Sequence, residues 1–207
     1  MNYEWNFGDG NFNYLVNSSH RYNNSNNYNC ELKAISNFGC RDSISKSVIV
    51  FHQPEAKLTV NDSDQCLRFN QFKFNDISSI SIGSIVNHYW DTSSFVFTGN
   101  KDTSITYSNE GTKRLTYVVE SDKGCFDTIH QTLTVHPMPK AQFVINDSIQ
   151  CAQKNQFDFN SISTIAYGSI NHYWLINQAI NDTGNFISKI FTVADTPRIR
   201  LIASSDK

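Results

Sequence analysis

A repeat built around tryptophan is the feature that most constrains what this chain can fold into. The motif Asn-His-Tyr-Trp ends at Trp90 and again at Trp174, and a looser version, Asn-Tyr-Glu-Trp, ends at Trp5; these are the only tryptophans among the 207 residues. Trp5 and Trp90 are 85 positions apart. A large aromatic at one fixed point of a repeat is typical of the centre of a small core. We therefore expect three units, each with its own core around one tryptophan.

The repeat extends well beyond the tryptophan motif. Residues 61–72 match residues 146–157, with the same Asn, Asp, Ser, Gln, Cys and Phe at corresponding positions. One residue is dropped near Val86, so Trp90 and Trp174 are 84 positions apart. Matches this numerous and in register indicate true internal repetition.

The period also gives the expected domain organisation. The chain begins just before the first tryptophan, and it ends at Lys207, which matches Lys123 one residue before a Gly-Cys pair. We expect the C-terminal part of one repeat at 1–53 and a complete repeat at 54–138. At 139–207 we expect a repeat that lacks its last hairpin strand.

Short apolar and β-branched runs separated by turn residues predict strands throughout. Leu115, Tyr117 and Val119 alternate with polar residues, and Asp-Lys-Gly at 122–124 predicts a turn before the next strand. We predict about seven strands in the complete repeat, no helices, and a surface loop at the Asn-rich segment 23–29. The pattern predicts an all-β protein of tandem β-sandwiches, each tryptophan lying in a separate two-layer core. A β-solenoid is the alternative, although its repeats are usually much shorter.

Composition and charge exclude several classes of function. A net charge of −2 and a pI near 6.3 are not those of a basic nucleic-acid-binding protein, and no polybasic patch suggests membrane binding. No apolar run approaches the ~20 residues that span a bilayer, so we expect no membrane insertion. No signal peptide is visible, but because the start looks truncated, this does not argue for a cytoplasmic protein.

The first repeat carries a specific motif. Residues 3–10 read Tyr-Glu-Trp-Asn-Phe-Gly-Asp-Gly, and residues 20–22 read His-Arg-Tyr. This combination resembles PKD domains, whose pattern has Trp-Asp-Phe-Gly-Asp-Gly followed by His-x-Tyr. The other repeats keep Tyr-Trp at 89–90 and 173–174 but replace the glycine turn. With a Cys before the second strand and Gly-Cys in the last hairpin, the repeats are similar to those of large secreted proteins from Bacteroidetes-type bacteria.

The resemblance implies immunoglobulin-like sandwiches in tandem, the first and last truncated, on a secreted or cell-surface protein. It also implies structural roles for the repeated aromatics and the glycine turn, namely Trp5, Trp90, Trp174, Tyr22, Tyr107, Gly8, Asp9 and Gly10. We expect Asp9 to cap backbone amides of its own turn. Calcium binding is the alternative, but no further oxygen ligands lie at binding-loop spacing. His88 and His172 are expected to be strand-face residues rather than catalytic ones, because the first repeat has Tyr3 at this position.

The cysteines recur at two places in the repeat. Cys66 and Cys151 follow a first strand, and Cys40 and Cys125 lie in a last hairpin. One of each per repeat suggests a disulfide, Cys66–Cys125, and an oxidising compartment. A simple sandwich, however, places these two at opposite ends, beyond the ~7 Å Cα separation that a disulfide permits. Cys66 then bridges to the following repeat or stays reduced. Cys30 is expected to be a small buried hydrophobe, and no pair has zinc-site spacing.

These features predict a non-catalytic extracellular spacer or adhesion module within a larger bacterial surface or secreted protein, without cofactors. Its partners are neighbouring repeats of the parent protein, with surface glycans or proteins as further candidates. Proline-containing linkers at 53–54 and 136–139 favour extended junctions. The alternative is an accessory polysaccharide- or protein-binding module attached to a secreted enzyme. Phe95, Phe97 and Tyr14 are candidate sugar-stacking aromatics, although their neighbours favour core positions on edge strands.

Overall fold

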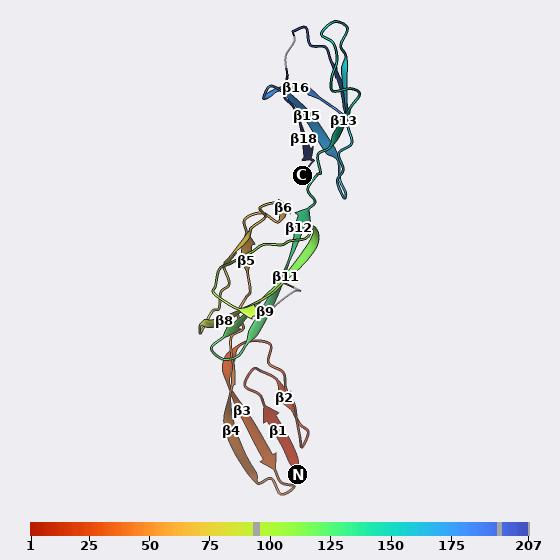
Figure 1. Cartoon of the computed structure of the whole chain (residues 1–207). Helices are drawn as coiled ribbons and strands as arrows, with labels where there is room; N and C mark the ends of the chain where they lie inside the picture. Colours follow the sequence, from red (N-terminus) through yellow and green to blue (C-terminus); the bar gives the residue numbers. More distant parts are fainter. Residues whose placement is uncertain (93–95, 194–195, 207) are drawn as a thin grey trace. The chain divides into compact units, whose positions relative to one another are not determined.

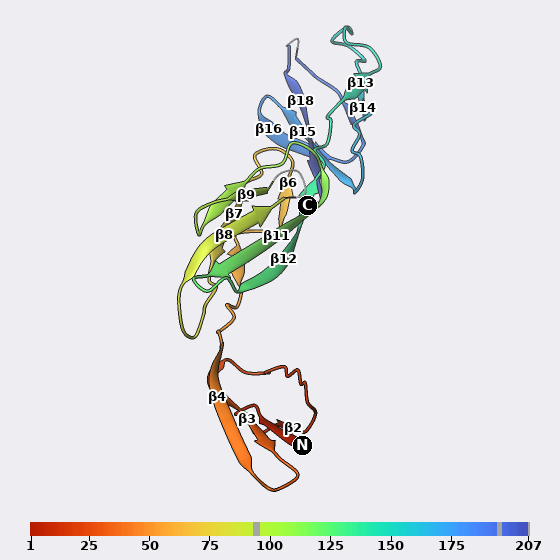
Figure 2. The ribbon, with the colours of Figure 1, turned by 90° about the horizontal axis from the view of Figure 1, so that it is seen from below.

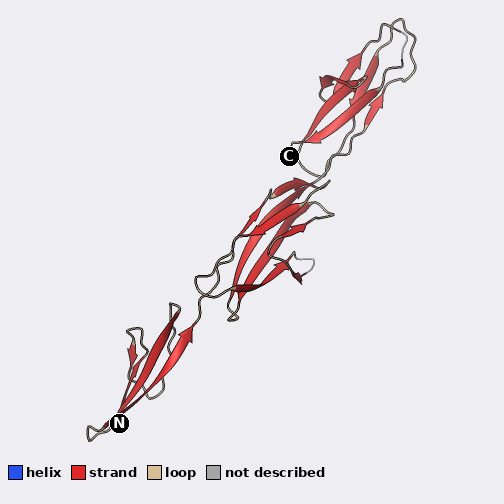
Figure 3. Cartoon of the chain, turned by 90° about the vertical axis from the view of Figure 1, so that its left-hand side faces the viewer, coloured by secondary structure: helices blue, strands red, loops and turns tan. Residues whose placement is uncertain are grey.

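The regular structure of the protein is entirely β. The computed structural model describes residues 1–92, 96–193 and 196–206, and these residues form eighteen strands and no helix (Figure 3). Nearly all strand pairs are antiparallel. The strands form separate sheets of three to five strands, as in β-sandwiches and unlike the stacked coils of a β-solenoid. The prediction of an all-β protein with tandem immunoglobulin-like sandwiches is confirmed.

Residues 2–50 form one four-stranded sheet, in the order β2-β1-β3-β4 (Figure 1). Its strands are β1 (Asn2–Asn6), β2 (Phe12–Asn13), β3 (Asn26–Ile35) and β4 (Arg41–Val50). The predicted loop at 23–29 is wrong in its second half, because β3 begins at Asn26 and pairs there with Val50 of β4. Tyr28 explains the difference, since its buried ring secures this polar stretch in the sheet.

The next segment forms a three-stranded and a five-stranded sheet. The first has the order β10-β7-β5 and the second β6-β12-β11-β8-β9. The strands are β5 (Leu58–Val60), β6 (Asp64–Cys66), β7 (Phe72–Asp76), β8 (Ile85–Asp91), β9 (Val96–Thr98), β10 (Thr103–Ile105), β11 (Gly111–Ser121) and β12 (Phe126–His136). The rings of Phe74 on β7 and Trp90 on β8 lie 5.9 Å apart, so one sheet packs on the other. β6, whose sequence Asp-Gln-Cys has no strand pattern, pairs in parallel with the end of β12.

The last segment forms two three-stranded sheets that face each other (Figures 1 and 2). One has the order β13-β14-β17 and the other β16-β15-β18. The strands are β13 (Phe143–Ile145), β14 (Phe157–Ser161), β15 (Ile170–Ile176), β16 (Ala179–Thr183), β17 (Phe186–Lys189) and β18 (Ile199–Ser205). Phe159, Trp174, Ile187 and Leu201 form the buried cluster between these layers.

Residue contacts group the chain into two compact units. The first comprises Met1–Thr59, Phe74–Thr103 and Arg114–Gln131, and the second comprises Val60–Lys73, Ser104–Lys113 and Thr132–Lys207. The boundaries expected from the repeat, after residues 53 and 138, are not tested by this division and stay predictions.

The three tryptophans share one hydrogen bond but differ in burial. Each indole donates to a backbone carbonyl ten residues ahead: Trp90 to Asn100, Trp174 to Gly184 and Trp5 to Leu15, at 3.2, 2.9 and 3.2 Å. Trp90 and Trp174 are fully buried, whereas Trp5 is only partly buried. In residues 1–53 the described strands form a single sheet, so the prediction of a two-layer core around Trp5 is wrong.

An asparagine clamp recurs beside these cores. Asn70 donates to the carbonyls of Leu67 and Tyr107 and accepts from the Tyr107 amide, each at 2.8 Å. Asn155 makes the same three bonds, to Ala152 and twice to Phe191. The residue before each clamp has a left-handed backbone, with φ of 64° at Phe69 and 63° at Lys154. The buried amide therefore holds a turn that L-residues rarely adopt.

Two further identical residues fasten the same turn. Gln65 and Gln150 each accept a backbone amide, from Gln71 and Gln156, and each donates to the carbonyl of that same residue. The asparagines four residues earlier, Asn61 and Asn146, also donate to these carbonyls. Residues of the longest sequence match thus form a network of hydrogen bonds that shapes one loop.

Replacing the clamp should destabilise the complete repeat. Asn70→Ala leaves a buried amide and two carbonyls without partners, so we expect the free energy of unfolding to fall by about 1–3 kcal/mol. Urea unfolding followed by fluorescence measures the change. Asn87→Ala, which removes one exposed bond to Glu120, is the matched control and should cost less than about 0.5 kcal/mol. Equal losses in the two variants contradict the structural role of the clamp.

Candidate functional site

The motif residues of the first repeat form a ladder of stacked rings. Phe7 stacks on His20 with ring centroids 4.2 Å apart, the Tyr22 ring meets His20 edge-on at 4.7 Å, and Tyr22 stacks on Tyr28 at 4.1 Å. The Tyr22 hydroxyl donates to the Phe7 carbonyl at 2.9 Å. The residues that carry the motif are thus engaged with one another.

The glycine turn of the motif is closed by its own side chains. Gly8 and Gly10 have φ of 82° and 91°, and a Cβ at Gly8 would lie 2.7 Å from the Asn29 carbonyl oxygen. Glycine is therefore required at Gly8 on two counts. Asp9 accepts the Asn11 amide at 3.1 Å through one oxygen and lies 2.7 Å from His20 Nε2 through the other. Asp9 occupies the capping role, and no cluster of three metal-ligating side chains occurs in the described part of the chain.

The environment of Asp9 favours its charged form. The hydrogen bond from His20 and those from Asn11 lower the pKa of the Asp9 carboxyl, against a smaller opposing effect of burial. His20 is in turn held by its stacking on Phe7. The carboxylate thus joins the ring ladder to the glycine turn.

A second titratable cluster lies in the complete repeat. His88 Nδ1 is 2.6 Å from the Tyr117 hydroxyl and 3.9 Å from Asp76, a buried carboxylate that accepts the Ser78 amide at 2.7 Å. Burial, and then the charge of Asp76, raise the pKa of Tyr117 well above its ordinary value. His88 lies on the face of strand β8 as expected. The third repeat has Leu201 in place of Tyr117 and Ser161 in place of Asp76, so the cluster is not a repeated feature.

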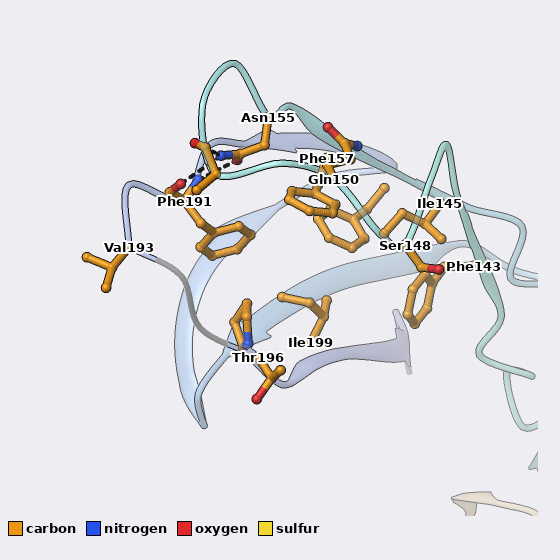
Figure 4. A pocket seen from close by; sticks show the side chains of 13 residues that line it. Phe143, Ile145, Ser148, Gln150, Asn155, Phe157, Phe191, Val193, Thr196 and Ile199 are labelled. Atoms are coloured by element: carbon orange, nitrogen blue, oxygen red, sulfur yellow. Dashed lines mark hydrogen bonds between the residues drawn. The ribbon is translucent and has the colours of Figure 1, made fainter.

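A cavity of about 500 Å³ opens in the last sandwich (Figure 4). Its apolar lining includes Phe143, Phe157, Phe191 and Ile199, and polar side chains come from Ser148, Gln150, Asn155 and Thr196. Figure 4 shows the rings of Phe157 and Phe191 on the side of the cavity that faces Ile199. Among the described residues that line the cavity, none is charged. The described lining is mostly apolar and is suited to apolar groups.

Tyr107 illustrates a role that the sequence could not specify. Its ring meets Phe72 at 5.8 Å, but its buried hydroxyl has no hydrogen-bond partner among the described residues. Burial raises the pKa of this phenol. The third repeat has Phe191 at the same place in the clamp, which fits a site that does not use the hydroxyl.

Of the candidate sugar-stacking aromatics, the structure describes the side chain of Tyr14 alone. Tyr14 is 69% exposed, next to the exposed Phe12, Leu15 and Val16. Phe95 lies outside the described residues, as does the side chain of Phe97 on β9. Tyr14 is therefore not a core residue, contrary to the preferred expectation.

The cysteines do not support the pairing within one repeat. Cys66 pairs with His136 at the last residue of β12, whereas Cys125 immediately precedes Phe126, the first residue of that strand. The described residues contain no disulfide. β12 is 11 residues long, so its two ends lie too far apart for a disulfide. The Cys66–Cys125 bridge is therefore not supported, and the alternatives for Cys66 stay predictions. Cys30 is only partly buried on β3.

Comparison with known proteins identifies the first segment. Residues 1–51 match the family model of the PKD domain. The PKD1 domain of Vibrio anguillarum Epp is similar at 20% identity over 42% of this chain and 96% of that one, with a TM-score of 0.36. A carbohydrate-binding module of the β-sandwich superfamily, described for its promiscuous specificity, is similar at 14% identity over 73% and 83%, with a TM-score of 0.38. No curated protein matches the chain.

The fold and the repeated cores define an array of immunoglobulin-like β-sandwiches. More particularly, the chain contains a PKD domain at residues 1–51, where the ring ladder and the glycine turn lie. The similarity to repeats of Bacteroidetes-type proteins stays a prediction. Within the part of the chain that the structure describes, no helix is long and apolar enough to cross a membrane.

Acid should loosen the glycine turn of the PKD domain. Because the pKa of Asp9 is lower in the folded state, its contribution to stability is present above the ordinary aspartate value of about 3.9 and is lost as pH falls through the folded value. In an NMR titration, the amides of Gly8 and Asn11 should shift with a midpoint below about 3.9. Asp9→Asn should abolish this step, and Asp42→Asn on β4 should leave it unchanged. A midpoint at or above that of a free aspartate contradicts the assignment.

Removing the Tyr107 hydroxyl should not harm the protein. Tyr107→Phe keeps the ring on Phe72 and deletes a buried polar atom without a partner among the described residues, so we expect the free energy of unfolding to rise by up to about 1 kcal/mol. Urea unfolding measures it. Tyr22→Phe, which loses the bond to Phe7, should instead destabilise its repeat by about 1 kcal/mol. A clear loss of stability in Tyr107→Phe shows that the hydroxyl has a role.

Proposed function

We propose that the chain is a non-catalytic extracellular spacer or adhesion module made of tandem PKD-like repeats within a larger cell-surface or secreted bacterial protein. The observation that carries this proposal is that the repeated residues make contacts within their own repeat. The indoles, the Asn70 and Asn155 clamps and the Gln65 and Gln150 bonds are all engaged inside the sandwiches. Because these repeated residues maintain the fold, the repeats are suited to setting the length and stiffness of the parent protein.

The junctions between repeats support the spacer role. At the first junction, Gln53 donates to the Phe126 carbonyl at 3.1 Å, and the Ala56 amide donates to Asp127 at 2.7 Å. At the second, the Tyr167 hydroxyl donates to the Val135 carbonyl at 3.1 Å. These bonds, added to the fixed φ of Pro54 and its restriction of Gln53, oppose free bending of each junction.

The last two repeats also begin with the same pair of backbone hydrogen bonds. Glu55 exchanges two backbone hydrogen bonds with Ser79, at 2.8 and 3.1 Å. Lys140 does the same with Thr164, at 2.7 and 3.1 Å. The residue that follows each linker is therefore tied into its own sandwich, which shortens the segment that can flex.

A binding role is the second candidate, and one observation favours it. The exposed side chains of Phe12, Tyr14, Leu15 and Val16 form a run of apolar surface in the PKD domain. An exposed aromatic can stack on a sugar ring or anchor a protein contact. This candidate is an accessory polysaccharide- or protein-binding module beside a secreted enzyme.

Loosening the first junction should expose it to protease. Asp127→Ala removes the acceptor of the Ala56 amide, a loss of about 1 kcal/mol, so cleavage near residues 52–57 should become about fivefold faster. Timed proteolysis with mass spectrometry measures the rate. Asp42→Ala, on an exposed face of β4, is the control and should cleave at the original rate. Unchanged cleavage in Asp127→Ala means that the bond does not restrain the junction.

A glycan array on the whole chain separates the two candidates. The spacer proposal expects no specific binding. Binding that falls at least about tenfold in Tyr14→Ala, but not in Tyr3→Ala, supports the binding module and overturns the spacer as the sole role.

A further inference from the structure

The outward face of the β16-β15-β18 sheet differs in charge from the matching face of the complete repeat. In the complete repeat, Asp91 of β8 pairs with Thr116 of β11. In the last repeat, Leu175 of β15 pairs with Arg200 of β18 at the corresponding position. Arg200 precedes the buried Leu201, so its side chain points away from the core. The last repeat has therefore lost an acid and gained an arginine on this face.

A second acid of this face is replaced in the last repeat. Glu120 of β11 accepts hydrogen bonds from the Tyr89 hydroxyl and from the Asn87 side chain. Ser204 of β18 stands at the corresponding position of the last repeat. Tyr173, which corresponds to Tyr89, therefore lacks the carboxylate partner that Tyr89 has.

Two exposed arginines of the last repeat have no counter-charge in an ion pair. Arg198 and Arg200 lie about 7 Å apart along the extended chain and point to the same side. Neither forms an ion pair with a described residue. Asp182, the acid of the neighbouring strand β16, is engaged with Lys189 at 3.1 Å. The charge of the arginines is therefore available to a ligand.

The hairpin between β15 and β16 holds one of these arginines in place. The Asn177 amide donates to the Arg198 carbonyl, and the Asn177 side-chain oxygen accepts the Arg198 amide, both at 3.0 Å. Asn177 and Gln178 have left-handed backbones, with φ of 51° and 73°, as in a two-residue hairpin turn. A surface pocket of about 550 Å³ is lined by Leu175, Gln178 and residues 198–200. Hydrogen bonds between the turn and β18 thus fix the rim of this pocket.

The chemistry of this surface suits an anionic sugar chain. A guanidinium group keeps its charge and makes paired hydrogen bonds to an oxyanion such as a carboxylate or a sulfate. Tyr173 and Leu175 lie two residues apart on β15, so both offer apolar surface on the outward face, where a sugar ring can stack. The Gln178 amide can bond sugar hydroxyls. An acidic peptide uses the arginines but gives the aromatic ring no role.

We propose that a polysaccharide carrying carboxylate or sulfate groups binds this outward face, here called the arginine face and formed by Tyr173, Leu175, Gln178, Arg198 and Arg200. The two guanidinium groups pair with the anions, and the tyrosine stacks on a sugar ring. The inference rests on the binding role, the second candidate above, and assigns that role to the last repeat. The complete repeat, with two acids on the same face, does not bind this ligand.

The test measures binding of short oligogalacturonates to the full chain by isothermal titration calorimetry at low ionic strength. Arg198→Gln with Arg200→Gln removes two charges from the arginine face. The matched control, Arg41→Gln with Arg68→Gln, removes the same charge from two exposed arginines elsewhere. We expect the first pair to weaken binding at least about tenfold and the control pair less than about twofold. Equal weakening in the two variants overturns the proposal.

Two further ligands identify the anionic group. Methyl-esterified oligogalacturonate is neutral and should bind at least about tenfold more weakly than the acid form. Equal binding of the two forms contradicts recognition of an anion. Dextran sulfate fragments of similar length separate sulfate from carboxylate. Tighter binding of either ligand, lost in the arginine variant, supports the site and names its anion.

Other variants separate this proposal from its alternatives. Tyr173→Leu should weaken oligogalacturonate binding about fivefold and leave poly-glutamate binding unchanged. If poly-glutamate binds as tightly as the sugar and Tyr173→Leu affects neither, the ligand is an acidic peptide and the polysaccharide is overturned. Binding that is lost in Tyr14→Ala but kept in the arginine variant overturns the arginine face and leaves the binding role. Absence of binding to every ligand overturns both and leaves the spacer role.

Discussion

Burial of one indole with its N–H satisfied is the constraint on which each complete sandwich depends. Removing the ~200 Å² of a tryptophan from water stabilises a core by up to about 5 kcal/mol, but only if the ring nitrogen keeps a hydrogen-bond partner. In each repeat the indole N–H donates to the backbone carbonyl ten residues after the tryptophan, which is Trp5, Trp90 or Trp174. That spacing fixes how the strand after each tryptophan turns back, and so fixes where the neighbouring strands can pair.

The second sheet of each sandwich depends on a different set of contacts. Phe74 and Phe159 pack on the tryptophan rings from the opposite layer, at 5.9 Å in both cases. The Asn70 and Asn155 clamps then hold the left-handed turn that precedes these strands. Polar and apolar parts of the repeat are therefore coupled, because the clamp sets the direction from which the phenylalanines reach the indole.

The first and last repeats surround their tryptophans with different side chains. In the PKD domain the ring ladder of Phe7, His20, Tyr22 and Tyr28 supplies the packing, and Trp5 stays partly exposed. In the last repeat Trp174 is fully buried, and Phe143, Phe157 and Ile199 line a cavity in the same sandwich. The position of the tryptophan is thus repeated in the sequence, whereas its burial differs between the copies.

The sequence by itself determined the period, the all-β class, the PKD motif of the first repeat and the central place of Trp90 and Trp174, because alternation and large aromatics report burial locally. It missed β6, since three residues of Asp-Gln-Cys carry no strand pattern until β12 lies beside them. It also could not show that the identical Asn and Gln residues form a clamp, or that Tyr14 is exposed. Only the tertiary structure decided these points, and with them the separation of Cys66 from Cys125, because hydrogen-bond partners far apart in sequence are set by how strands pair.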